Sequence, residues 1–96
     1  MADLLDADGL RQGLEILEGW DGNLGGIEKT WTFTDFDEAV RFVVRVADVV
    51  RVPNHHPDVD IRWNKVTLKL VSHSAGGLTQ ADIDTAALID RETEGF

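Results

Sequence analysis

The sequence contains no cysteine and no tyrosine, and it has only two prolines and one methionine among 96 residues. The lack of cysteine excludes disulfides, thiolate nucleophiles, iron–sulfur clusters and Cys-ligated zinc. Positive charge is also scarce: nine Lys and Arg oppose 18 Asp and Glu, giving a formal net charge of −9. This balance disfavours direct contact with nucleic-acid phosphates or an acidic membrane surface, and no basic stripe offsets it.

Long apolar runs are missing as well. No run approaches the roughly 20 residues of a membrane span. The first residues, Met1 to Asp6, lack the basic start and apolar stretch of a signal peptide, so we expect a cytoplasmic protein. A chain of this length is expected to form one domain over residues 1–96, with a core held by packing alone.

Three segments have the apolar spacing of helices. The first follows Asp6 or Asp8, either of which can cap it. The second covers residues 35–51, because Asp35 and a glutamate three residues later form a capping-box pattern and a proline follows the segment. The third begins at Thr79.

Strand-like alternation of apolar and polar residues fills the intervals. It covers residues 27–34, 59–63 and 66–70, with Asn64 and Lys65 as the expected turn of a hairpin. A weaker signal around Trp20 indicates a short edge strand. The order is therefore αββαββα, which predicts an α+β fold: a four-stranded antiparallel sheet with helices packed on one face.

The three histidines are the only side chains that ordinarily titrate near neutral pH. His55 and His56 lie in a loop between Pro53 and Pro57, and His73 follows the last predicted strand. Both loops flank the same hairpin, so we expect them to converge at one end of the sheet. Imidazoles placed this way suit general acid–base catalysis. A zinc site with three histidines and ordinary surface histidines remain alternatives at this point.

A longer pattern surrounds these histidines and extends upstream to Gly19-Trp20 and to Phe33-Thr34-Asp35-Phe36. Its segments are His55-His56-Pro57, Trp63-Asn64-Lys65-Val66, Ser72-His73, Gly77-Leu78-Thr79 and Asp82-Ile83. The pattern resembles the pterin-4a-carbinolamine dehydratase family over nearly the whole chain. One position departs from it, because Arg51 stands where the family usually has an acidic residue, and this bears on the degree of activity.

The resemblance implies an enzyme of the αββαββα fold that forms dimers or tetramers. Its reaction dehydrates 4a-hydroxy-tetrahydropterin, left after an aromatic amino acid hydroxylase has used its cofactor, to quinonoid dihydropterin and water. It implies no metal and no redox cofactor. The chemistry fits the residues, because hydroxide must leave C4a as water while a base takes the proton from N5.

The resemblance also implies roles for individual residues. His55, His56, His73 and Asp82 form the catalytic set, with His55 and His73 as the acid or base candidates and His56 as a positioning residue. Asp82 could hold His73 in one tautomer, as a carboxylate does for other catalytic imidazoles, or could serve the start of the third helix. The two roles of Asp82 are compatible.

Three further residues are expected to bind the substrate: Pro57, Trp63 and Ser72. For Trp63 the alternative is burial, because it continues the apolar side of the strand that precedes it. Trp20 and Trp31 are assigned to the core or to contacts between subunits.

A competing function is non-catalytic. The resemblance extends to animal proteins that also act as dimerisation cofactors of a homeodomain transcription factor, and to relatives with assembly roles. A binding or assembly protein on the same fold is therefore the alternative to the dehydratase. Self-association is expected in either case, because a small domain with three Trp and four Phe gains from burying them between subunits.

Overall fold

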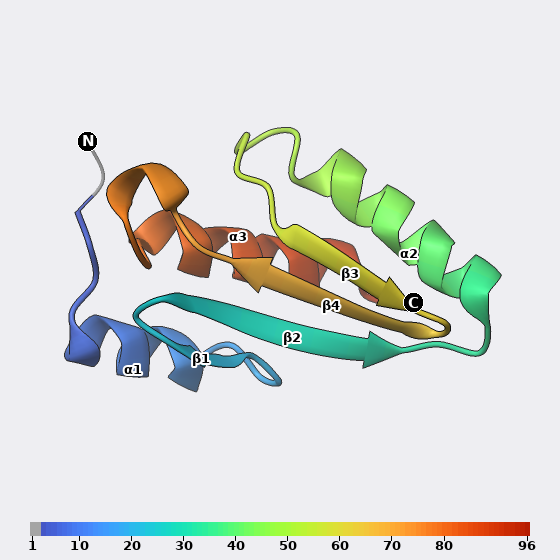
Figure 1. The fold of residues 1–96 in the computed structure, drawn as a ribbon, viewed down its shortest axis with the longest axis horizontal. Helices are drawn as coiled ribbons and strands as arrows, with labels where there is room; N and C mark the ends of the chain where they lie inside the picture. Colours follow the sequence, from blue (N-terminus) through green and yellow to red (C-terminus); the bar gives the residue numbers. More distant parts are fainter. Residues whose placement is uncertain (1–2) are drawn as a thin grey trace.

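A four-stranded antiparallel sheet forms one layer of the molecule, with strand order β1-β2-β4-β3 and the helices on one face (Figure 1). The computed structural model describes residues 3–96, and the expectations for Met1 and Ala2 lie outside the described residues. The elements are α1 (Ala7–Glu15), β1 (Asp21–Asn23), β2 (Gly26–Thr32), α2 (Phe36–Val49), β3 (Asp58–Arg62), β4 (Lys65–Leu70), a 3₁₀ turn (His73–Ala75) and α3 (Gln80–Glu92). The predicted fold class and element order are confirmed.

Side-chain caps set the starts of α1 and α2. The carboxylate of Asp6 accepts a hydrogen bond from the Gly9 amide at 2.9 Å, and that of Asp35 accepts one from the Glu38 amide at 2.8 Å. The Glu38 side chain reaches one residue further back than expected, because it accepts from the Thr34 amide at 2.9 Å. Each cap satisfies an amide that lacks a partner within the helix, which explains why the sequence signals located these ends well.

The core lies between the sheet and the helices. Phe42 of α2 is at its centre, with its ring centroid 4.8 Å from that of Trp31 and 4.9 Å from that of Phe33. Trp20 is buried and meets Trp31 edge to face, as expected for a core residue. The other buried apolar residues are Leu17, Ile27, Ala39, Val46, Val49, Val50, Val66, Leu68, Leu70, Leu78, Ile83, Ala86 and Ile89.

A polar cluster fixes the C-terminal half of α3 against β2. Asp90 accepts a hydrogen bond from the Trp20 indole at 3.0 Å and forms an ion pair with Lys29 at 3.1 Å. Asp82 lies eight residues earlier on the same helix, about 12 Å away along its axis. The cluster therefore fixes the helix that carries Asp82.

The β3–β4 hairpin departs from the sequence prediction by one residue. Its turn consists of Trp63 and Asn64, with Arg62 opposite Lys65. Trp63 adopts a left-handed conformation (φ 56°) and is 67% exposed, so the alternative of burial is wrong. The reason lies in the residue that follows β2. The Phe33 amide donates a hydrogen bond to the Asn64 carbonyl at 2.8 Å, and the Asn64 side-chain amide donates to the Phe33 carbonyl at 2.8 Å, which fixes Asn64 in the turn.

One helix end also differs from expectation. Helix α2 ends at Val49, two residues before the predicted end. The strand near Trp20 begins one residue later, at Asp21, and pairs with β2 at the edge of the sheet. Across residues 3–96, none of the helices has the length and apolar character needed to cross a membrane.

Candidate active site

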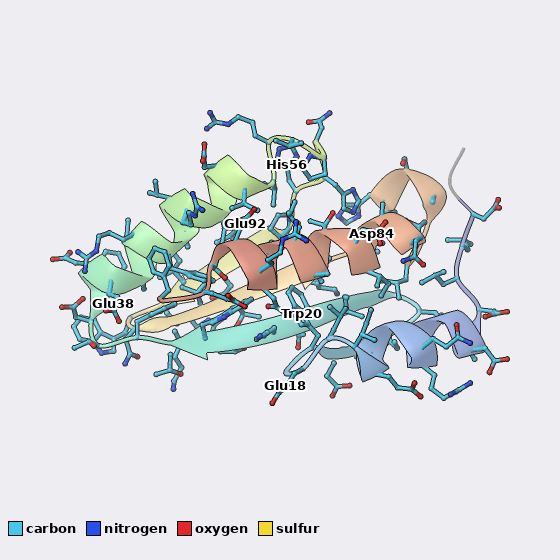
Figure 2. The ribbon with its side chains drawn as sticks, turned by 180° about the vertical axis from the view of Figure 1, so that it is seen from behind. Glu18, Trp20, Glu38, His56, Asp84 and Glu92 are labelled. Carbon is cyan, nitrogen blue, oxygen red and sulfur yellow. The ribbon has the colours of Figure 1, made fainter. Side chains whose placement is uncertain are left out.

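The loop between α2 and β3 presents the two adjacent histidines in different environments. Asn54 has a left-handed backbone (φ 51°) that bends the chain just before them. The His55 side chain is only 21% exposed, whereas His56 is exposed on the outside of the loop (Figure 2). The two adjacent imidazoles therefore lie in different surroundings, one partly buried and one exposed to solvent.

Asp82 is the centre of the buried part of the site. It is fully buried in the first turn of α3, and its Oδ1 lies 2.5 Å from Nε2 of His55. Its Oδ2 accepts hydrogen bonds from the Thr79 amide and the Ser72 hydroxyl, both at 2.9 Å. The expected contact between Asp82 and His73 is therefore wrong, because the carboxylate holds His55. The other expected role is observed, since the same carboxylate caps the start of α3.

Ser72 lies just after β4, at the start of the loop that carries His73. Its amide donates to the Gly77 carbonyl at 3.1 Å, which closes the loop on itself. Gly76 completes the loop with a left-handed backbone (φ 83°), a conformation that favours glycine. The Ser72 hydroxyl contacts Asp82 and the Thr79 hydroxyl, the latter at 2.7 Å, and the residue is buried. The hydroxyl expected to bind substrate is thus engaged within the protein.

His73 forms a second, more open pair with a carboxylate. Its Nε2 lies 3.9 Å from Oδ2 of Asp58, and its side chain is 77% exposed. Asp58 was missed by the sequence reasoning. The signal that could have found it is its place directly after Pro57. Because β3 runs antiparallel to β4, the first residue of β3 lies beside the end of β4, from which the His73 loop continues.

Both histidine-bearing loops are therefore held at the same end of the sheet, as predicted. The first is fixed through Asp82 on α3, which Ser72 of the second loop also contacts. Pro57 joins the first loop to β3 and so belongs to this end as well. Trp63 does not: it lies in the turn at the far end of β3, about 16 Å from Asp58 for five residues of extended chain.

Comparison with known proteins identifies the family of the chain. A family model for pterin 4 alpha carbinolamine dehydratase matches residues 3–92. The chain belongs to the pterin-4a-carbinolamine dehydratase family. Among its curated relatives, "Putative pterin-4-alpha-carbinolamine dehydratase" of Roseiflexus castenholzii is 48% identical over 90 residues, which covers 94% of this chain and 97% of the relative. A protein of the same name from Sulfurisphaera tokodaii is 44% identical over 81 residues, covering 84% and 87% of the two chains.

Two solved structures have the same fold. The transcriptional coactivator/pterin dehydratase from Brucella melitensis matches with a TM-score of 0.86 and 27% identity, over 95% of this chain and 99% of the other. A pterin dehydratase-like protein described as a RuBisCO assembly factor in the alpha-carboxysome matches with a TM-score of 0.61 and 18% identity, over 80% and 89% of the chains. The second likeness concerns the fold alone. The fold thus occurs both in a structure named as a dehydratase and in an assembly factor.

Arg51, the one departure from the family pattern, is exposed at the end of α2. Its side chain is 75% exposed, and its guanidinium lies 3.9 Å from the carboxylate of Asp48 in the last turn of α2. Across residues 3–96, no three His, Asp or Glu side chains are grouped so that they could hold a metal ion. The polar side chains described at this end of the sheet are imidazoles, carboxylates and hydroxyls.

Proposed function

We propose that this protein dehydrates a 4a-hydroxy-tetrahydropterin to quinonoid dihydropterin and water, by general acid–base catalysis with His55 and His73. The observation that carries this proposal is the buried contact between Asp82 and His55 at 2.5 Å. A carboxylate in this position fixes the orientation of an imidazole, as it does for catalytic histidines in other enzymes. Membership of the dehydratase family supplies the class of substrate.

The reaction requires two proton transfers and no electron acceptor. The bond between C4a and its hydroxyl oxygen breaks, the oxygen takes a proton from a general acid, and water leaves. The proton on N5 passes to a general base, and the electrons of the N5–H bond form the double bond between N5 and C4a. One imidazole ends with a proton more and the other with a proton less, and exchange with solvent restores both. Groups of this kind typically contribute about 10²- to 10⁴-fold each.

The contact of His55 decides which of its nitrogens can meet the substrate. Its Nε2 faces Asp82, so Nδ1 is the nitrogen that remains to exchange a proton with the pterin. His73 lies on the open side of the site, where it can approach the substrate from solvent. His56 and Pro57 are proposed to position the pterin ring, since both flank His55 on the loop.

The proposal is tested by following the loss of a 4a-hydroxy-tetrahydropterin, generated in situ by an aromatic amino acid hydroxylase, through its absorbance. We expect the purified protein to accelerate dehydration at least about tenfold over the spontaneous rate near neutral pH. No acceleration by the folded protein at any pH from about 6 to 8.5 would contradict the enzymatic function. The non-catalytic assembly role, which the same fold serves elsewhere, would then become the better explanation.

We also propose that the protein self-associates through β3, the exposed edge of the sheet. Arg62 and Lys65 flank a two-residue turn and form a hydrogen-bonded pair, so the peptide groups of Val59 and Ile61 point outward. Val59 is 46% exposed and Trp63 67% exposed, which leaves an apolar strip along this edge. An uncovered strand edge of this kind is a template for pairing with another chain.

The charges on β3 favour a second copy in one particular register. Antiparallel pairing centred on Ile61 places Asp60 opposite Arg62 of the second copy, and Val59 opposite its Trp63. Centring on Arg62 would place the two Arg62 side chains opposite each other, which is destabilising. Centring on Asp60 would place the two Asp60 side chains opposite each other and offset the gain from setting Arg62 opposite Asp58. Pairing centred on Ile61 also brings the Trp63 of the second copy next to the start of β3. Trp63 would thereby reach the histidine end of the sheet that it cannot reach within its own chain.

We expect the association to respond to charge reversal at this edge. Asp60→Arg or Arg62→Asp alone puts like charges opposite each other twice, so the dissociation constant should rise about tenfold or more. The double variant restores opposite charges and should restore the dimer. Sedimentation equilibrium measures this against the chain mass of 10.6 kDa, with Asp8→Arg on the remote, exposed helix α1 as the control. An assembly that is indifferent to all three edge variants would rule out this pairing.

A further inference from the structure

Two buried hydroxyl groups extend the contact between His55 and Asp82 into a longer chain. Ser72 Oγ lies 2.9 Å from Asp82 Oδ2 and 2.7 Å from Thr79 Oγ1. A serine hydroxyl has a single proton, and Ser72 donates it to the carboxylate. The Thr79 hydroxyl must therefore donate to Ser72. The direction of the hydrogen bonds is thus fixed from Thr79 through Ser72 to Asp82.

This arrangement occupies one carboxylate oxygen and leaves the other for the imidazole. Oδ2 of Asp82 accepts from both the Ser72 hydroxyl and the Thr79 amide, while Oδ1 faces His55 Nε2. Capping α3 requires only the amide contact, which an aspartate at this position makes by itself. The hydroxyl of Ser72 comes from a different segment, the loop after β4. The helix cap therefore does not explain why the Ser72 hydroxyl contacts Asp82.

We propose that Ser72 and Thr79 are positioning residues that hold Asp82 in the orientation that gives His55 its Nε2–H tautomer. The catalytic consequence rests on the proposed dehydratase function, whereas the effect on the tautomer does not. With two donors on Oδ2, turning the carboxylate out of this plane would leave a buried donor unsatisfied, which disfavours other orientations. Ser72 then acts through Asp82 and not through contact with the pterin.

The direct test is the tautomer of His55, read from the side-chain ¹⁵N shifts of the protein by NMR near pH 8, where an ordinary imidazole is neutral. We expect Nε2–H in the wild type. Ser72→Ala should raise the Nδ1–H fraction at least about twofold, because Oδ2 of Asp82 then keeps only the Thr79 amide as a donor. Thr79→Val should act in the same direction, because Ser72 loses the hydroxyl that orients it toward Asp82. Ser72→Thr and Thr79→Ser keep the hydroxyls and should keep the wild-type tautomer. An unchanged tautomer in both hydroxyl-free variants would overturn the proposal.

Kinetics provide a second measurement. Ser72→Ala should lower kcat about tenfold with KM within about twofold, because a misaligned imidazole slows proton transfer without loosening the substrate. A raised KM with unchanged kcat would mean that Ser72 contacts the pterin, and this would overturn the positioning role. Thr67→Val is the matched control: it removes a hydroxyl pair of similar length, 2.8 Å to Thr30, on the exposed sheet face. It should change neither measurement.

The two proposals fail in different ways. If the wild type has no dehydratase activity but the tautomer of His55 shifts in Ser72→Ala, the proposed function is wrong and the positioning role stands. If the wild type is active and the tautomer of His55 is unchanged in the hydroxyl-free variants, the positioning role is wrong and the proposed function stands. Thermal unfolding of each variant shows whether it is folded under the conditions of both measurements. If Thr79→Val is unstable, Ser72→Ala is compared with Ser72→Thr as the folded reference.

Discussion

Replacing His55 by alanine is expected to lower kcat for dehydration by about 10²- to 10³-fold, the effect of losing one general acid or base. His55 is the imidazole that a buried carboxylate orients, so its loss removes both a proton-transfer group and its alignment. His73→Ala should also reduce kcat, by at least about tenfold, because the reaction needs a second proton-transfer group. The measurement is initial rate against substrate concentration, corrected for the spontaneous reaction.

Asp82→Asn tests the role of the carboxylate that orients His55. With Ser72 and the Thr79 amide donating to one atom, the amide nitrogen of Asn would face His55 and donate to its Nε2. The imidazole would then carry its proton on the nitrogen that should meet the substrate. We expect kcat to fall nearly as far as in His55→Ala, while the double variant falls no further, because the two groups act as a unit. Additive losses, or a fully active His55→Ala, would contradict this mechanism.

His56→Ala is the comparison that separates catalysis from binding. His56 is exposed and makes none of the buried contacts that orient His55. If it positions the pterin, its removal should raise KM more than it lowers kcat. A kcat loss in His56→Ala as large as that in His55→Ala would mean that the roles assigned to the two adjacent histidines are wrong.

The fold could be predicted from sequence where local signals were strong. The caps at Asp6 and Asp35 act within a single turn, and the alternation in β2 and β4 reflects one buried face. Trp63 was misplaced because its position depends on Phe33, 30 residues earlier, which holds Asn64 in the turn. Alternation alone cannot detect such a contact.

The sequence predicted most residues of the candidate site, but it did not predict which of them contact each other. Asp82 is nine residues from His73 and 27 from His55 in the sequence, yet it contacts His55. The reason is that the 3₁₀ turn at His73 directs that side chain to the surface, while Asn54 bends the preceding loop so that His55 reaches α3. Asp58 was missed because its partner His73 becomes a neighbour only through the pairing of β3 with β4.

The largest loss of stability is expected at Phe42. Its side chain is fully buried, and its ring contacts Trp31 of β2, Phe33 just after β2 and Phe96 from the end of the chain. Phe42→Ala should reduce the free energy of unfolding by about 3–5 kcal/mol, the sum of lost transfer energy and the cavity left behind. A domain of this size has roughly 5–15 kcal/mol in total, so the variant should lie near its folding limit. Urea denaturation measures the change.

Val44→Ala is the matched control, because it lies two residues away on the same helix and is 63% exposed. Its effect should stay within about 0.5 kcal/mol, as is usual for surface positions. A small loss of stability in Phe42→Ala would mean that the core closes around the missing ring.

Phe42→Ala should also affect the candidate active site, because of where α2 lies in the chain. Helix α2 leads directly into the loop of His55, so a loosened α2 should reduce dehydratase activity even under conditions where most molecules remain folded.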